Sequence, residues 1–442
     1  MLLRRTLPAY VVVPLVASLV AAAAVIGADA RWLAAIGAVV ARGTLPHSLP
    51  FATAPTSGWH DVPALAELVF HALEAAFGDR GLLLLNTIAV ASGFGVLVVA
   101  LRRQGATAAA ALLVGLLVFV GSLPEIGAVR NGLFSVALFP VLLWLLEDDD
   151  DARFRLVVPL IALWSNLHGA VLVGWAVLWL HVLVARRRAV PVAAVATLAL
   201  CATPALWHTP QYYWSVSTNE AARRGVQLWA PLGLRPFDIV LVLVAVALGI
   251  VARRRFRLWE LVAAAVLAAG TVKAARYGEW LILLLAFPAA RAVRLTVPAR
   301  VPALVVPLFA ALIAIVLART PYDAGSRRLA TEAARAHAPV LADAVLAEQV
   351  ELAGGLVWVA DPIDAFRRRD QALYLDWLDG RRRGRAALDH ARLVLVSPTS
   401  TAGEAAARDP RLVRSGRDAR AVLYRVRAGR RGLESAAWRR HA

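Results

Sequence analysis

The stretch PAYVVVPLVASLVAAAAVIG, residues 8–27, decides the class of fold. It contains no charged side chain, and roughly 20 mostly apolar residues are what an α-helix needs to cross a bilayer. The next stretch, ADARWLAAIGAVVARGTLPHSLPF (residues 28–51), begins with an acidic residue, Asp29, and ends in a region rich in Gly and Pro. We therefore expect a first membrane-spanning anchor that is followed by a loop at the membrane surface.

Apolar runs of similar length recur along the chain, which has 442 residues, 60% of them hydrophobic. Beyond the first run they cover residues 81–101, 106–123, 131–146, 189–206, 237–252, 258–272, 279–293 and 299–318. A longer run, residues 156–185, is broken by the polar sequence around Asn166 and His168, and we interpret it as two short helices. The pattern predicts a membrane all-α fold, a polytopic bundle of about 11 transmembrane helices.

The formal charge of +18 is concentrated in alternate connections between these runs. Arginines cluster within residues 4–5, 102–103, 153–155, 186–188, 253–257 and 291–300. Such alternation follows the positive-inside rule, so we expect a cytoplasmic N-terminus and an extracytoplasmic Asp29. Because topology accounts for the charge, we expect the lipid bilayer and no nucleic acid as a partner.

Three blocks follow from the composition. Residues 1–318 form the transmembrane domain, with large external loops at 28–80 and 207–236, and residues 319–428 form a small C-terminal extracytoplasmic α/β domain. Its expected strands are 356–360, 393–396 and 421–426, and its expected helices are 331–350, interrupted near Pro339, and 371–378. The remaining block, 429–442, is basic and expected to be mobile. A single cysteine, Cys201, excludes a disulfide within the chain.

The first external loop contains the strongest candidates for chemistry. A short helix is expected over residues 31–40 and an amphipathic interfacial helix over 63–77. Asp29 lies at the depth where a carboxylate can activate a hydroxyl group beside a lipid-borne substrate, although Asp is also favoured as a helix N-cap. Glu67 and His71 share a helix face and could hold a metal ion. Two ligands leave a zinc site incomplete, however, so we interpret this face as solvated. The sequence indicates no cofactor and no metal site, although it leaves a divalent metal ion open.

Other polar residues lie at the expected ends and breaks of spans. Arg130, Lys273 and Arg276 could grip a phosphate at the external surface or act as interfacial anchors. Asn166 and His168 could line a cavity at membrane depth or cap the two half-helices.

Several short motifs resemble the GT-C superfamily of integral membrane glycosyltransferases. They are D-x-R-W-x-x-x-x-G (29–37), G-x-L-P-x-x-x-P-F (43–51), Trp59 with the Glu67 helix, R-N-G-L-F-S (130–135), W-S-N-L-H-G (164–169) and Arg276 in KAARYGEW. The segment GGLVWVADPIDAFRRRDQALYLDWLDG also looks like the C-terminal region of these proteins. The chain is most similar in pattern to uncharacterised bacterial members related to polyprenyl-phosphate-dependent mannosyl and aminoarabinose transferases.

This resemblance implies inverting transfer of a sugar from a polyprenyl-phosphate donor to a cell-envelope glycan, lipid or protein. The reaction would take place on the external face of the plasma (inner) membrane, with Asp29 as general base. The resemblance and the residue types together suggest these substrate-binding residues: Arg31, Trp59, His60, Glu67, Arg130, Asn166, His168, Lys273 and Arg276.

Two departures from the family pattern leave other functions open. Leu49 replaces an Asp that often precedes the Pro-Phe pair, and Leu228 replaces the Glu of a common Glu-Trp pair. One alternative is a transporter or lipid flippase that uses Asn166 and His168. The other is a catalytically inactive membrane scaffold.

Overall fold

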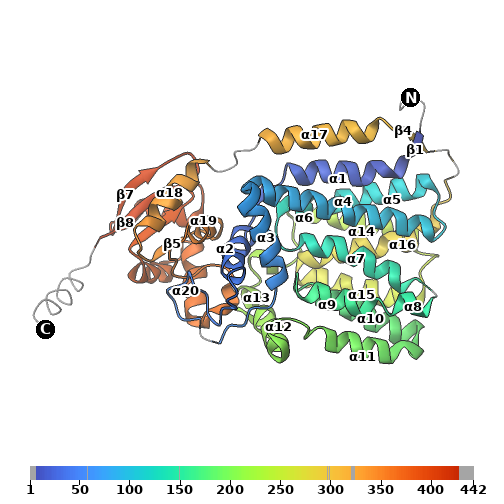
Figure 1. Cartoon of the computed structure of the whole chain (residues 1–442), viewed down its shortest axis with the longest axis horizontal. Helices are drawn as coiled ribbons and strands as arrows, with labels where there is room; N and C mark the ends of the chain where they lie inside the picture. Colours follow the sequence, from blue (N-terminus) through green and yellow to red (C-terminus); the bar gives the residue numbers. More distant parts are fainter. Residues whose placement is uncertain are drawn as a thin grey trace, which may run out of the picture. The chain divides into compact units, whose positions relative to one another are not determined.

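The structure is a computed structural model that describes residues 6–56, 58–148, 150–295, 297, 299–319 and 324–427. The chain divides into two compact units (Figure 1). Unit 1 comprises Met1–Leu45 and His60–Thr320, and unit 2 comprises Pro46–Trp59 and Pro321–Ala442. The expected basic tail, residues 429–442, lies outside the described residues.

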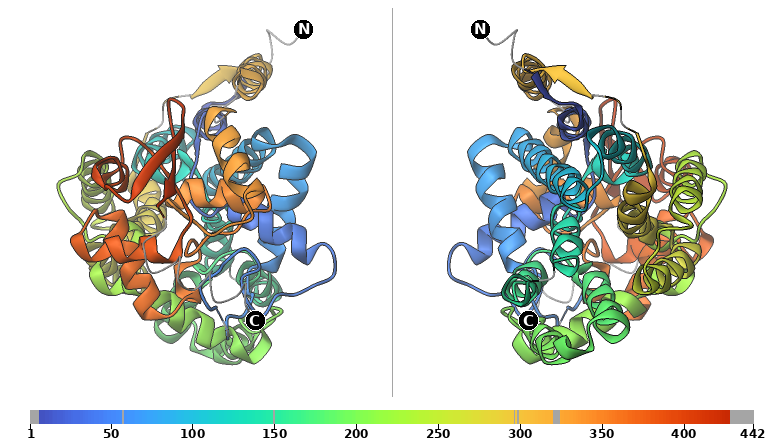
Figure 2. Two further views of the ribbon diagram at one scale, coloured as in Figure 1. Left: turned by 90° about the vertical axis from the view of Figure 1, so that its left-hand side faces the viewer. Right: turned by 90° about the vertical axis from the view of Figure 1, so that its right-hand side faces the viewer.

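Unit 1 is a bundle of helices around one apolar core. Its helices are α1 (Val12–Ala22), α2 (Ala30–Val40), α3 (Ala64–Phe77), α4 (Asp79–Arg103), α5 (Ala108–Gly121), α6 (Leu123–Ile126), α7 (Leu133–Leu146), α8 (Asp151–Phe154), α9 (Val157–Ser165), α10 (Val171–Ala185), α11 (Val190–Ala199), α12 (Thr209–Thr218), α13 (Glu220–Arg224), α14 (Pro236–Ala252), α15 (Leu258–Lys273), α16 (Gly278–Ala292) and α17 (Val305–Arg319). Figure 2 looks at the bundle from its two ends, and its right-hand view runs along the helix axes.

The helices are shorter than the apolar runs that predicted them. Within the described ranges, α4 alone is long and apolar enough to cross a membrane by length and composition. Seven further apolar helices have 10–17 residues. The first run, for example, begins with strand β1 (Thr6–Pro8) and a single 3₁₀ turn, so that α1 starts only at Val12. The count of 11 spans therefore stays a prediction.

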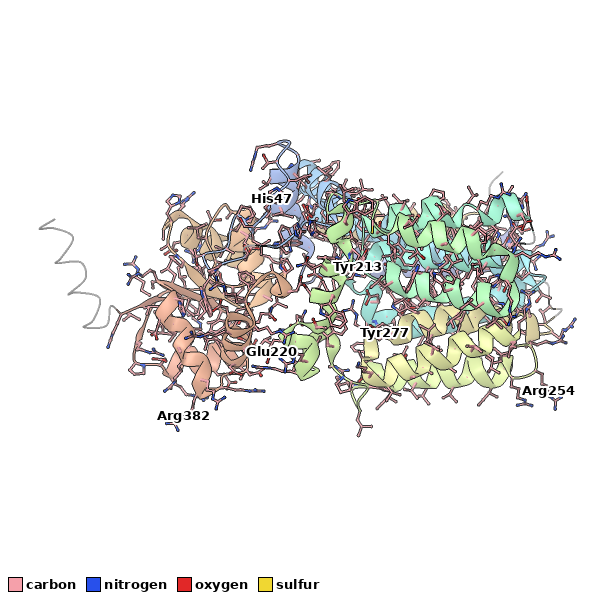
Figure 3. The ribbon with its side chains drawn as sticks, turned by 90° about the horizontal axis from the view of Figure 1, so that it is seen from below. His47, Tyr213, Glu220, Arg254, Tyr277 and Arg382 are labelled. Atoms are coloured by element: carbon pink, nitrogen blue, oxygen red, sulfur yellow. The ribbon has the colours of Figure 1, made fainter. Side chains whose placement is uncertain are left out.

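The arginine-rich connections gather at one end of unit 1. Arg257 lies directly before α15, and Arg291 lies in the last turn of α16. Both pair with Glu147, the residue after α7. Arg186, after α10, donates a hydrogen bond to the backbone carbonyl of Asp148 over 2.7 Å. Figure 3 shows Arg254 at this end of the unit, far from Tyr213 and Tyr277 toward the other end. This clustering supports the predicted alternation of loops without deciding which side is cytoplasmic.

A two-stranded parallel pairing lies at the opposite end. Strand β2 (Val25–Ile26), directly after α1, pairs with β3 (Ala128–Val129), which follows α6. The pairing is extended by a hydrogen bond of 3.2 Å from the Gly27 amide to the Val129 carbonyl. Asn86, buried in α4, donates to the carbonyls of Ala21 and Ile126 over 3.2 and 3.1 Å. Its amide thereby ties together the ends of α1 and α6, whose last carbonyls have no partner within their own helices.

Helices α2 and α3 of the first loop cross at a glycine. A Cβ atom on Gly37 would overlap the backbone carbonyl of Glu67 and lie 2.8 Å from Cβ of His71. The close crossing fixes α3 against α2. The observed bounds, Ala30–Val40 and Ala64–Phe77, differ from the predicted helices by one residue at the N-terminus.

Unit 2 is built on a four-stranded mixed sheet with the order β5-β6-β8-β7. Its elements are α18 (Ala324–Arg335), β5 (Val340–Ala342), α19 (Ala344–Leu352), α20 (Arg368–Leu378), β6 (Leu393–Val396), α21 (Thr401–Arg408), β7 (Leu412–Arg417) and β8 (Val422–Val426). Strands β5 and β6 run parallel, whereas β8 is antiparallel to both β6 and β7.

Two sequence predictions for this unit were wrong. The predicted helix 331–350 contains a strand, β5, because the chain leaves α18 before Pro339 and only then enters α19. The predicted strand 356–360 is reduced to isolated bridges, in which Val357 pairs with Val340 on one side and with Ala52 on the other. The second partner comes from the segment 46–59, so part of the first loop belongs to unit 2.

The crossing at Gly37 leads to a stability prediction. We expect Gly37→Ala to lower the free energy of unfolding by about 1–3 kcal/mol, because the new methyl group overlaps the α3 backbone. The matched control is Gly95→Ala in α4, where an added Cβ meets nothing within 4 Å. That control should be neutral or slightly stabilising, since Ala is the better helix former. Thermal unfolding in detergent measures both, and an equal shift in the two variants would contradict the close crossing.

Candidate functional site

Asp29 lies at the start of α2 in an unusual backbone conformation. Its φ is 81°, a region that non-glycine residues seldom adopt. Its backbone carbonyl accepts the first helical hydrogen bond, from the Leu33 amide over 2.9 Å. Its side chain makes no capping hydrogen bond to that helix. Asp29 therefore occupies the N-cap position of α2 without the side-chain hydrogen bond that usually favours an Asp there.

The pairing of β2 with β3 brings Arg130 beside Asp29. Arg130 follows β3 directly, and its side chain packs on Gly27, where a Cβ would lie 3.0 Å from Nε and 3.2 Å from Cγ. The Arg130 Nε is buried and has no hydrogen-bond acceptor among the described residues. One edge of this guanidinium thus retains an unsatisfied donor.

Arg276 approaches the same place from another element. It lies in the 3₁₀ turn Ala275–Tyr277 between α15 and α16, and its guanidinium stands 5.1 Å from the ring centre of Trp229. Arg130 and Arg276 both line a cavity of about 270 Å³ in unit 1. Its further polar lining residues are Glu125, Gln227, Arg235, Asp238 and Glu279.

The electrostatics of Asp29 reflect these neighbours. Burial raises the pKa of the Asp29 carboxyl group, and the positive charges of Arg130 and Arg276 act in the opposite direction. A carboxyl group with a raised pKa is a better proton acceptor once ionised. Asp29 therefore lies within the electrostatic reach of Arg130 and Arg276, and all three residues were site candidates from the sequence.

Asn166 and His168 occupy the break between α9 and α10 and are held by hydrogen bonds. The Asn166 side-chain amide donates to the backbone carbonyls of Ala162 and Ala202. The backbone carbonyl of Asn166 accepts a hydrogen bond of 3.2 Å from the Ala66 amide, at the start of α3. His168 Nδ1 lies 2.7 Å from Ser135 Oγ. Since Trp164 Nε1 donates to the same hydroxyl over 2.7 Å, the hydroxyl proton is available to His168. His168 also lies within the electrostatic reach of Arg276.

The other predicted site residues lie elsewhere. Arg31 is fully buried and pairs with Asp79 through Nε and Nη2, over 3.2 and 3.3 Å, which fastens α2 to the start of α4. His60 stacks on His208 with ring centres 4.1 Å apart. Lys273 is exposed at the last residue of α15 and does not line the cavity. Trp59 is buried and belongs to unit 2.

Glu67 is not on a solvated helix face, and this expectation was wrong. Its side chain is fully buried, whereas Leu65 and Leu68 are each 37% exposed. The helix buries its polar face because that face packs on α2 and meets a second carboxyl group, Asp61. Its apolar face is left outward, as it would be against lipid.

Asp61 and Glu67 form a buried carboxyl pair within hydrogen-bonding reach of each other. Apart from the carboxyl groups of the pair, no group among the described residues donates a hydrogen bond to any of their four oxygens. Burial raises the pKa of Asp61 to about 6. Burial, the Asp61 charge and their hydrogen bond together raise the pKa of Glu67 well above its usual value. The raised pKa values therefore favour a proton shared by the pair.

Sequence reasoning missed Asp61, Glu125 and Glu279. Asp61 stands six residues before Glu67 with Pro63 between them, a spacing that a turn into a helix can close, and this signal was available. Glu279 is buried and accepts a hydrogen bond of 2.9 Å from Ser122 Oγ, a contact over 157 positions that no local pattern indicates. Within the described ranges, no group of three or more His, Cys, Asp or Glu side chains could hold a metal ion.

The buried pair leads to a pH prediction. Between the pKa of an unfolded Asp, about 4, and the folded value of about 6, the folded chain keeps a proton that the unfolded chain has lost. Stability should therefore fall as the pH rises through this window. We expect Asp61→Asn to gain melting temperature relative to the wild type at pH 8, but not at pH 4. The control is Glu404→Gln, an exposed carboxylate in α21, and a pH-independent difference for Asp61→Asn would refute the shared proton.

Comparison with known proteins identifies the fold. No protein-family model matches the chain, and no curated protein matches it in sequence. Among solved structures, ArnT from Cupriavidus metallidurans in the apo state is similar with a TM-score of 0.55 and 14% identity, covering 94% of this chain and 96% of that chain. ArnT from the same organism bound to undecaprenyl phosphate has a TM-score of 0.45 and 14% identity, covering 94% and 97%.

ArnT is an aminoarabinose transferase of the GT-C superfamily. The apo structure aligns over nearly the full length of both chains. At 14% identity it concerns the fold alone. The chain has the GT-C-like fold of ArnT, as the sequence resemblance implied.

Proposed function

We propose that the chain is a membrane glycosyltransferase that transfers a sugar from a polyprenyl-phosphate donor to an acceptor in the cell envelope. The observation that carries the proposal is the half-buried Asp29 carboxylate, which lies within the electrostatic reach of Arg130 and Arg276, two arginines that line one cavity. The GT-C-like fold supports it, because ArnT itself is a transferase of this superfamily.

Asp29 serves as the general base in this proposal. Its ionised carboxylate accepts the proton of an acceptor hydroxyl group, and the resulting oxygen nucleophile attacks the anomeric carbon of the donor sugar. The bond from that carbon to the phosphate oxygen breaks as the new glycosidic bond forms, so the configuration at carbon inverts. The absence of a capping hydrogen bond to α2 supports this role, since the carboxylate is not used to hold its own helix.

Arg130 and Arg276 bind the phosphate that departs with the lipid. As the sugar leaves, negative charge develops on the phosphate, and cations already fixed at the cavity stabilise it without rearranging. The Arg130 Nε supplies a donor that has no acceptor among the described residues. The Arg276 guanidinium lies over the ring of Trp229, which helps to fix its position at the cavity.

We place this site on the extracytoplasmic face of the inner membrane. The support is the gathering of arginine-rich loops, represented by Arg254, at the end of unit 1 away from Tyr213 and Tyr277 (Figure 3). Tyr277 belongs to the same turn as Arg276, so the cavity lies toward the arginine-poor end. By the positive-inside rule the arginine-rich end is cytoplasmic.

The role of Asp29 is tested by Asp29→Asn in the purified chain reconstituted in lipid with radiolabelled polyprenyl-phosphate sugars. We expect kcat to fall by roughly 10²–10⁴-fold, because a neutral amide cannot accept the proton. In the wild type, activity should decline as the pH falls through the raised pKa of Asp29. The control is Glu220→Gln, a carboxylate of the same unit that pairs with Arg224 and does not line the cavity. Full turnover by Asp29→Asn would remove Asp29 from the chemistry.

The role of the two arginines is tested by Arg130→Gln and Arg276→Gln in the same assay. Each loses a charged hydrogen-bond donor to phosphate, so we expect KM for the donor to rise, or kcat/KM to fall, by about tenfold or more. Arg254→Gln removes the same charge at the other end of the unit and should change neither constant. Unchanged kinetics in both cavity variants would contradict phosphate binding here.

A further inference from the structure

A second, larger cavity opens at the arginine-rich end of unit 1. It has a volume of about 950 Å³ and is lined by residues of α7 and α9 and by the C-terminal end of α4. Its floor is apolar and includes Leu145, Leu160 and Leu163. Its rim is polar and includes Arg103 and Gln104. We name it the α7/α9 groove. It shares no lining residue with the cavity of the proposed active site.

The groove combines the two chemistries of a phospholipid. Leu163 is 44% exposed, so the floor continues onto the outer surface of the bundle. An apolar floor of this kind suits an acyl chain, since burying each CH₂ group contributes about 0.8 kcal/mol. The rim lies where the helices end, at the depth of lipid headgroups.

Among the described residues, the rim has an arginine without a carboxylate partner and an amide donor without an acceptor. The Arg103 guanidinium stands 4.5 Å from the ring centre of Trp144, and the described residues offer it no carboxylate. Gln104 accepts a hydrogen bond of 2.9 Å from Arg291 Nη1, while its own buried Nε2 has no acceptor among the described residues. Arg103 and Gln104 are consecutive, so a cation and an amide donor stand side by side.

The two acidic residues of the rim each pair with arginine, Glu147 through Oε2 alone, since its buried Oε1 has no partner among the described residues. Glu147 pairs with Arg257 and, over 3.7 Å, with Arg291. Asp148 pairs with Arg153 over 3.2 Å. Positive charge also exceeds negative charge in the surrounding connections. Residues 102–103, 147–155, 186–188 and 253–257 contain eleven arginines and five acidic residues.

We propose that the α7/α9 groove binds one anionic phospholipid, with its phosphate on Arg103 and Gln104 and an acyl chain along the leucine floor. Basic pockets between membrane helices recognise anionic headgroups in this way. The occupant is a lipid from the surrounding bilayer and not the sugar donor. The inference requires that unit 1 is embedded in a membrane, but it does not depend on the glycosyl transfer or on Asp29.

The test is lipid retention by the purified full-length chain, measured by native mass spectrometry after exposure to equal amounts of phosphatidylglycerol and phosphatidylcholine with matched acyl chains. We expect one phosphatidylglycerol per chain and at least about tenfold preference over phosphatidylcholine. Arg103→Gln should reduce that preference about tenfold. Arg254→Gln, which removes an exposed arginine at the same end but outside the groove, should change it by less than twofold.

A second variant separates the acyl site from the charge. Leu163→Trp fills the floor and leaves Arg103 in place, so total lipid retention should fall while the protein still elutes as a folded monodisperse species. If Arg103→Gln lowers the folded yield, the retention measured with Leu163→Trp tests whether the groove binds a lipid. Three results would overturn the proposal: equal retention of the two lipids, equal effects of Arg103→Gln and Arg254→Gln, or full competition by soluble glycerol 3-phosphate. The last would mean a headgroup site without an acyl chain.

Discussion

The short pairing of β2 with β3 is the constraint on which the candidate site depends. Two residues of parallel strand place the chain after α1 against the chain after α6, and so set Asp29 beside Arg130 across 101 positions of sequence. Such a short ladder is weak alone, but the buried Asn86 amide holds both helix ends through two hydrogen bonds. A half-buried carboxylate near cations needs this rigidity, because a small displacement would weaken the compensation of its charge.

Features that depend on local sequence could be predicted well. The helices of the first loop were predicted within one residue of their observed starts, since Asp29 and Pro63 mark the turns before them. Strand β6 has the predicted bounds, because an unbroken run of four β-branched and leucine residues favours a buried strand. The choice of Asp29, Arg130 and Arg276 as site candidates followed from a resemblance in pattern together with the chemistry that a lipid phosphate requires.

Features that depend on contacts between distant residues could not be predicted. A two-residue strand such as β2 is too short to show an alternation of apolar and polar residues, so the sequence pattern does not predict it. The burial of Glu67 escaped notice because helical periodicity tells which residues share a face, but not whether that face meets water, lipid or protein. The role of Arg31 was hidden for the same reason, since its partner Asp79 starts a different helix. Local patterns define elements, and the site is made where the elements meet.

The segment 46–59 has a consequence for the order of synthesis. Thr53 bonds to the carbonyl of Val357, 304 residues later, so the sheet of unit 2 contains a strand-like piece made long before its neighbour. At ordinary translation rates the ribosome needs about 15–60 s to cover that distance. During this interval the piece has no partner and must stay extended without aggregating. Its prolines, at positions 46, 50 and 55, suit this waiting period because they resist both helix formation and premature strand pairing.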